Sequence, residues 1–111
     1  MIEDVVRDYL NLNLKVSTYL EKPKNTPKSY VIIEKIEESV TNHLYHATMA
    51  IQSYAQTMFE SSVLNEQVKL AMNGLVLLDE VTKSKLNTDY NDTDTAQKEY
   101  RYMAVYDIYF Y

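Results

Sequence analysis

Residues 100–111 alternate between two faces, and both faces are rich in apolar and aromatic side chains. One face carries Tyr100, Tyr102, Ala104, Tyr106, Ile108 and Phe110. The other carries Arg101, Met103, Val105, Asp107, Tyr109 and Tyr111. Strict alternation is typical of a β-strand, and a sheet in a lone small domain usually keeps one polar face. Either helices cover this strand on both sides, or one of its faces meets another protein, because Tyr, Met and Arg are enriched in interface cores.

Two segments have the periodicity of amphipathic helices. Residues 2–12 place apolar side chains at the i, i+3, i+4, i+7 and i+8 positions, namely Ile2, Val5, Val6, Tyr9 and Leu10. Residues 55–73 change to a similar spacing, with a polar face that includes Glu60 and Lys69. This second helix either ends in a C-terminal cap at Asn73–Gly74 or continues through Gly74 to Leu78.

Four further segments are predicted strands, because they are rich in β-branched and aromatic residues or alternate in polarity: residues 15–20, 30–36, 43–54 and 81–87. Polar connections separate them at residues 21–29, 37–42 and 88–95. The resulting order is α-β-β-β-α-β-β. It predicts an α+β fold in which two helices pack on a single, mainly antiparallel sheet. A length of 111 residues fits one domain spanning 1–111.

The shortage of glycine and cysteine excludes several kinds of active site. The chain has one glycine, which rules out Gly-rich phosphate loops and the flanking glycines of a nucleophile elbow. It has no cysteine, which removes disulfides, cysteine–zinc sites and the thiol nucleophile. Adjacent acids such as Glu37–Glu38 and Asp79–Glu80 lie on polar segments and are interpreted as solvated surface. We therefore expect no enzymatic activity and no cofactor.

Two groups of residues are candidate metal ligands. His43 and His46 are the only histidines, and on a predicted strand they point to opposite faces, so they do not converge on one ion. The run Asp89–Asp94 superficially resembles the start of an EF-hand loop. That loop needs glycine at position 6 and glutamate at position 12, where this chain has Asp94 and Arg101. We therefore expect no metal site.

The charge balance argues against binding to nucleic acid. The net charge is −5, from 16 acids and 11 basic residues, and the only basic cluster is Lys22, Lys24 and Lys28 in a Pro-containing loop. Stable attraction to phosphates needs clustered lysine and arginine. No apolar run approaches the roughly 20 residues that span a bilayer, and Met1–Asp4 does not have the layout of a signal peptide. We therefore expect neither stable nucleic-acid binding nor membrane insertion.

Two regions carry a resemblance to a known family. They are Asn42–His43 with His46–Ala55, and Lys85–Asp94 with Lys98–Asp107. Together they resemble small tail-terminator, or tail-to-head joining, proteins of the minor-capsid type from long-tailed phages and prophages of Gram-positive bacteria. The resemblance covers most of the chain from about residue 28 onward. It departs at Glu37–Thr41, where the family pattern leads us to expect a more glycine-containing turn.

The resemblance implies a structural virion protein that assembles with copies of itself into a ring, commonly of six subunits. Such a ring caps the tail tube and joins tail to head, so its partners are the tail-tube protein and the head-completion or connector protein. The implied location is the head–tail junction of the virion, reached from the host cytoplasm, and no cofactor or reaction is implied. The alternatives are a head-completion or minor capsid protein and a small dimeric α+β binding module.

Two groups of residues are predicted to contact neighbouring subunits or partners. The final strand supplies one patch, or the core that supports it, through Tyr102, Tyr106, Tyr109 and Tyr111. The predicted loop 88–95 supplies a contact with a neighbouring subunit or the tail tube through Asp89, Tyr90, Asn91 and Asp92. An excess of acids around a lumen would let DNA pass without being held.

Overall fold

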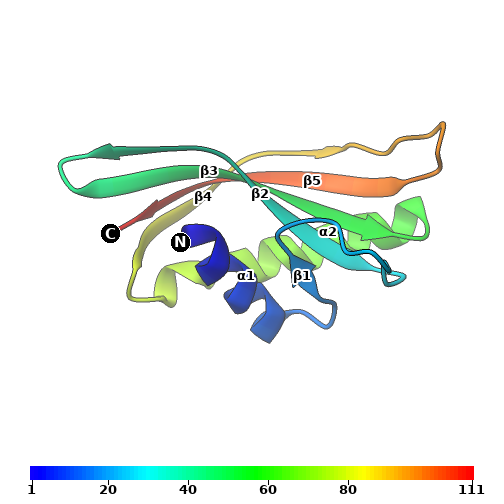
Figure 1. Ribbon diagram of the computed structural model, residues 1–111, viewed down its shortest axis with the longest axis horizontal. Helices are drawn as coiled ribbons and strands as arrows, with labels where there is room; N and C mark the ends of the chain where they lie inside the picture. The colour runs from blue at the N-terminus through cyan, green and yellow to red at the C-terminus, as the bar shows by residue number, and fades with distance from the viewer.

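The computed structural model describes all 111 residues and contains one five-stranded sheet, ordered β1-β2-β3-β5-β4 (Figure 1). The elements are α1 (Ile2–Asn13), β1 (Thr18–Tyr19), β2 (Tyr30–Thr41), β3 (Leu44–Ala55), α2 (Met58–Met72), the short 3-10 helix η1 (Leu75–Leu77), β4 (Val81–Asn91) and β5 (Tyr100–Phe110). All neighbouring strands pair antiparallel except β1, which is parallel to β2. The predicted α+β fold, with two helices on a mainly antiparallel sheet, is confirmed.

Both helices lie against the same face of the sheet, which we call the helix side (Figure 1). The other face, the open side, has no covering layer. The core lies between the helices and the sheet, and its members come from both helices and three central strands: Val6, Leu10, Leu64, Val68, Met72, Val31, Ile33, Met49, Ile51, Ala104, Tyr106 and Ile108. Alternate residues of each strand therefore fall into a buried set and an uncovered set.

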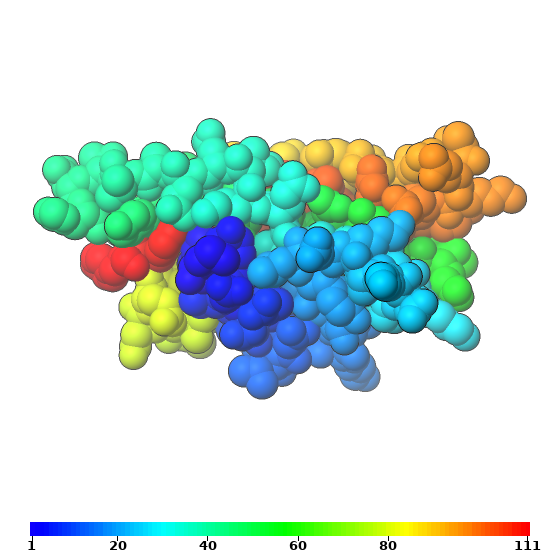
Figure 2. Space-filling view, viewed as in Figure 1, coloured from blue at the N-terminus to red at the C-terminus, as the bar shows by residue number.

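The sheet is longer than the helices that cover it. β2 and β3 have 12 residues each, which at about 3.3 Å per residue gives strands about 40 Å long. The longer helix, α2, has 15 residues and a length of about 22 Å. The β2–β3 hairpin therefore projects past α1 at one end of the molecule, and the β4–β5 loop projects at the other end (Figures 1 and 2).

The hairpin between β2 and β3 differs from the prediction. Residues 37–42 were expected to be a polar connection, but β2 continues to Thr41 and the turn is the two-residue Asn42–His43. Both turn residues have positive φ, 52° and 68°, as two-residue hairpins of the I′ type require. The predicted glycine is unnecessary because asparagine tolerates this conformation. His43 consequently lies in the turn and not on the strand.

Two other strand boundaries were predicted incorrectly. The expected strand 15–20 is reduced to Thr18–Tyr19, which pairs only with Val31 and Ile32. β4 was expected to end at Asn87 but runs to Asn91, with bulges near Thr82 and Asn87. The predicted loop 88–95 therefore begins only at Asp92.

α2 ends where the first of the two predicted alternatives places its end, with Asn73 as the C-cap, but the cap geometry is not the left-handed one typical of glycine. The helix stops at Met72, and Asn73–Gly74 leads into η1. Gly74 has φ −90°, so it is neither a left-handed cap nor part of a continuous α-helix. No helix in the structure is long and apolar enough to cross a membrane.

Candidate interaction surfaces

One row of apolar residues crosses four strands at the hairpin end of the sheet. Val40 pairs with Tyr45, Tyr45 with Phe110, and Phe110 with Val81, all on the helix side. We call these four residues the apolar row. The rings of Tyr45 and Phe110 stack with their centres 5.4 Å apart. Exposure rises along the row from 4% at Val81 to 55% at Val40, because the helices do not reach the β2 end.

A shallow hollow borders the apolar row. It has a volume of about 250 Å³ and is lined by Met1, Ile2, Val5, Glu80, Phe110 and Tyr111. Five of these six side chains are apolar or aromatic, and Met1 and Tyr111 are largely exposed. The hairpin end of the molecule therefore presents apolar surface that the chain itself does not cover.

The second uncovered apolar surface is the outer side of α2. Leu64, Val68 and Met72 face the core, whereas Phe59 and Leu70 are 75% and 71% exposed. A surface helix normally keeps its outer side polar. Hollows of about 280 Å³ beside Phe59 and about 360 Å³ beside Leu70 flank this side. The outer side of α2 therefore presents apolar side chains that the chain itself does not cover.

The sheet has two free edges of opposite charge. β4 is the outermost strand on one side, and β2 is uncovered beyond the two residues that β1 pairs with. Such edges present unpaired backbone N–H and C=O groups. The β4 edge carries Lys83 and Lys85, and the free part of β2 carries Glu34 and Glu37. None of the ion pairs within the chain uses these four residues.

A polar cluster occupies the open side around Asp107. Its carboxylate accepts hydrogen bonds from Thr48 Oγ1 at 3.1 Å and Asn87 Nδ2 at 2.9 Å, and lies 2.9 Å from His46 Nε2. Partial burial works to raise the pKa of Asp107, but the bonds from Asn87, His46 and Thr48 outweigh it and lower that pKa. The Thr48 hydroxyl is bonded to the carboxylate and not to the imidazole, so no hydroxyl-to-histidine relay is formed. The cluster links three strands.

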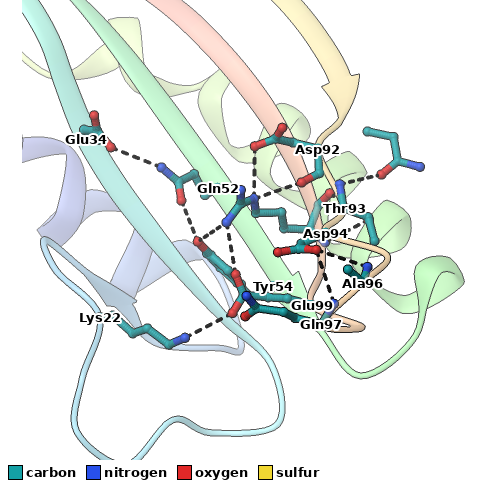
Figure 3. A network of polar contacts seen from close by, with 12 residues as sticks. Lys22, Glu34, Gln52, Tyr54, Asp92, Thr93, Asp94, Ala96, Gln97 and Glu99 are labelled. Carbon is teal, nitrogen blue, oxygen red and sulfur yellow. Dashed lines mark hydrogen bonds and ion pairs between the residues drawn. The ribbon is translucent and has the colours of Figure 1, made fainter.

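A second network ties the β4–β5 loop to the sheet, as Figure 3 shows. Arg101 Nε donates to the backbone carbonyl and the carboxylate of Asp92, both at 3.0 Å. Its Nη1 donates to Glu99 at 3.0 Å and to the Tyr54 hydroxyl at 3.3 Å. Lys22 Nζ donates to the same glutamate at 3.1 Å. One guanidinium therefore holds both ends of the loop.

The four predicted tyrosines are divided between different environments. Tyr109 lies on the open side, stacked on His46 at 4.6 Å and beneath Lys83. Tyr111 is exposed just beyond β5, and Tyr102 is half-buried on the helix side. Tyr106 is buried in the core, and burial raises its pKa to about 12. Because Tyr106 is buried, it cannot contact a neighbouring subunit directly. Of its two predicted roles, only that of a core residue supporting the patch is left.

The four residues predicted to act from a loop are also separated. Asp89 belongs to β4 and bonds to Asn65 and Lys69 of α2, so it is a structural contact. Asn91 approaches Met58, and Asp92 is held by Arg101. Tyr90 is the one exposed member that faces outward on the open side. No group of three or more His, Asp or Glu residues is placed to hold a metal ion.

Several surface residues were not singled out from the sequence. Val40 lies in a segment that was interpreted as a polar connection, and Tyr45 was placed on a strand without a role. The outer side of α2 had a usable signal, because Phe59, Val63 and Leu70 repeat at helical spacing opposite the core residues. No protein-family model matches this chain, and no curated protein matches it in sequence.

Proposed function

We propose that this protein is a structural subunit of a tailed-phage virion that closes into a ring, caps the tail tube and joins tail to head. The resemblance of residues 42–55 and 85–107 to tail-terminator proteins supports this proposal. The ring is expected to contain six subunits and to contact the tail-tube protein on one side and a head-completion protein on the other. No chemical step is part of the proposed function.

The observation that carries the proposal is the mismatch between the sheet and its helix layer. The helices cover the middle of the sheet and leave Val40 and Tyr45 exposed on the side where a core would otherwise form. Apolar surface in such a position is costly for a monomer and is removed when another subunit covers it. A ring needs two different patches per subunit, and the exposed end of the apolar row is one such patch.

The charge of the chain is compatible with a channel for DNA. The net charge is −5, and the acids exceed the basic residues by five. Duplex DNA binds where lysine and arginine neutralise its phosphates. A ring of such subunits would carry a strongly negative total charge, so DNA could pass through its opening without being retained.

The test is the mass of the purified protein by light scattering across a concentration series at moderate salt, with and without tail tubes. We expect a species with the mass of about six subunits. It can exist alone, in equilibrium with the monomer, or bound to the ends of tail tubes. A stable dimer at every concentration would support the dimeric binding-module alternative instead. A monomer that also fails to join tail tubes would contradict the proposal.

Two variants sharpen this test. The combined change Val40→Ser and Tyr45→Ser removes the exposed part of the apolar row, and we expect it to lower the ring population without unfolding the subunit. The matched control is Leu12→Ser at the end of α1, which removes another largely exposed apolar side chain. Equal loss of assembly in both variants would show that general surface polarity, and not the apolar row, is responsible.

A further inference from the structure

We propose that neighbouring copies join by continuing the sheet, so that β4 of one copy pairs antiparallel with the free part of β2 in the next copy. This inference rests on the proposed ring, since it names the contact that closes it. The free part of β2 is Ile33–Thr41, beyond the two residues that pair with β1.

The directions of the strands permit this junction without any rearrangement. β2, β3, β5 and β4 alternate in direction across the sheet. β4 therefore runs opposite to β2, and two copies in the same orientation meet with antiparallel edges. Copies in a cyclic ring all have the same orientation along its axis and use two different surfaces. The sheet would continue from subunit to subunit with one hydrogen-bonding pattern.

The charges of the two edges favour the unlike pairing. On the open side, Lys85 pairs in register with Asp107, Asp107 with Thr48, and Thr48 with Glu37. Lys85 and Glu37 thus lie at opposite ends of one row, and an in-register continuation brings Lys85 of the next copy beside Glu37. A two-fold contact between like edges would oppose lysines to lysines or glutamates to glutamates, which is unfavourable.

The helix side supplies apolar surface to the same junction. Val40 and Tyr45 are exposed at the β2 edge, and Val76 and Leu77 are exposed in η1, immediately before β4. Leu77 is 84% exposed, so it has no cover within the subunit. The apolar row begins at Val81 next to η1 and ends at Val40. Continuing the sheet therefore places the η1 residues of one copy near the exposed end of the row in the next.

The irregularities of the two edges also suit a closed sheet. β4 has bulges near Thr82 and Asn87, and β2 has one near Ile36. Bulges bend a strand and increase its twist, which a sheet that closes on itself requires. Bulges and lysines also discourage non-specific edge pairing, and here the opposite charges allow the one pairing that builds a ring.

A disulfide cross-link tests the junction directly, because the chain has no cysteine of its own. The test protein is the full chain with Lys85→Cys and Glu37→Cys. Within one subunit these positions are three strand spacings apart, about 14 Å, whereas a disulfide needs Cα atoms closer than about 7 Å. Any bond between them therefore joins two copies. Lys83→Cys with Glu37→Cys is run in parallel, because it samples pairing displaced by two residues.

We expect mild oxidation of at least one pair to give a ladder of covalent multimers up to the ring, reversed by a thiol reductant. The control pair Lys24→Cys and Glu60→Cys removes the same charges from exposed positions outside β2, β4 and η1, and we expect it to give no ladder. The single variant Lys85→Cys should also stay uncross-linked, because a dimer from it would reveal like-edge pairing and overturn the proposal.

The remaining outcomes separate this inference from the proposed function. A ring by light scattering in which neither pair cross-links above the control overturns the edge junction and leaves the ring standing. A protein that stays monomeric with tail tubes present and gives no ladder overturns both. Circular dichroism of each reduced variant checks that the subunit is folded, and a variant that fails this check is replaced by Lys85→Glu with Glu37→Lys. Each of these two changes alone is expected to weaken assembly, and the two together are expected to restore it. If neither change weakens assembly, the proposed junction is also overturned.

Discussion

The hydroxyl of Tyr9 donates a 2.6 Å hydrogen bond to the backbone carbonyl of Ala71, joining the middle of α1 to the last turn of α2. This carbonyl belongs to the last turn of the helix, where acceptors lack intrahelical partners, and it also accepts the backbone N–H of Gly74 at 3.0 Å. The phenol reaches it because the next turn contains Gly74, where a Cβ atom would lie 2.5 Å from the Tyr9 oxygen. The only glycine in the chain thus leaves room for a contact between the two helices.

Replacing Gly74 with alanine should therefore destabilise the protein. The added methyl group displaces the Tyr9 hydroxyl, and the lost hydrogen bond costs about 0.5–1.5 kcal/mol. Urea unfolding measures the change. In a Tyr9→Phe background the close oxygen is absent and the alanine Cβ makes only an ordinary 3.6 Å contact with the Ala71 carbonyl. At φ −90° the alanine also restricts the unfolded chain without strain, so we expect a neutral or slightly stabilising effect. An equal loss of stability in both backgrounds would show that the backbone at position 74, and not the Tyr9 hydroxyl, is the reason for glycine.

Asp89→Ala should destabilise the subunit by about 1–3 kcal/mol, because it leaves the buried amide of Asn65 without its acceptor. That amide donates to Asp89 at 2.7 Å, and Asn65 is almost fully buried. The ion pair with Lys69 is partly exposed and contributes less. Chemical denaturation compares this variant with Asp79→Ala, an exposed acid without hydrogen bonds. A similar effect of both changes would refute the role given to Asn65.

Tyr106 gives the protein a sensitivity to alkaline pH. Burial raises its pKa to about 12 from an ordinary 10.0, so the folded state keeps a proton that the unfolded state loses. The associated stability is present below pH 10 and is lost as the pH rises through 12. Tyr106→Phe should lose less stability than the wild type between pH 8 and pH 11. At pH 8 we expect the free energy of unfolding of Tyr106→Phe to differ from that of the wild type by less than about 0.5 kcal/mol, because Tyr106 makes no side-chain hydrogen bond within the chain. If the stability of both proteins falls equally between pH 8 and pH 11, Tyr106 is not the source of the alkaline sensitivity.

Tyr106→Ala, in contrast, should cost about 3–5 kcal/mol of folding stability, since it empties a core position. It lowers assembly by unfolding the subunit, so it cannot report on an interface. Tyr109→Ala on the open side is the informative replacement. It should leave the denaturation midpoint nearly unchanged, and a large loss of stability would show that its stacking on His46 is structural.

Asp107 gives the opposite dependence, on acid. Its pKa is lowered below the ordinary 3.8 by its hydrogen bonds, so the stability it contributes is present above that value and is lost as the pH falls through the lowered pKa. Asp107→Asn should cost about 1–2 kcal/mol at pH 7 through lost hydrogen bonds and should flatten the stability profile below pH 4. The control is Glu21→Gln, which replaces an exposed acid elsewhere. It should leave the dependence of stability on pH below pH 4 unchanged.

The elements with one buried face were predictable, and the edges were not. Alternation located β3 and β5 because helices bury every second residue on one side of them. The outer half of β2 and the end of β4 carry polar residues at consecutive positions, since neither face is covered and no partner strand follows. β1 depends on a distant parallel neighbour, which no local pattern of two residues can show.

The candidate surfaces were predictable only as possibilities. The final strand revealed two apolar faces, but the packing of α2 decides that Tyr106 is buried and Tyr109 is not. Asp89 looked like a loop acid because its partners, Asn65 and Lys69, lie on a helix that precedes it by about 20 residues. Val40 was hidden among acids, and its exposure follows from where the helices stop, which is a property of the assembled layers.

The place of β5 between β3 and β4 has a consequence for synthesis on the ribosome. β5 is the last strand of the sheet to be translated, yet it holds β4 to the rest. Until residues 100–110 emerge, the nascent chain has a β2–β3 hairpin and a β4 segment without a partner strand. A chain interrupted before residue 100 would therefore lack one of the two edges used in the proposed junction, and only a chain that contains β5 could form it.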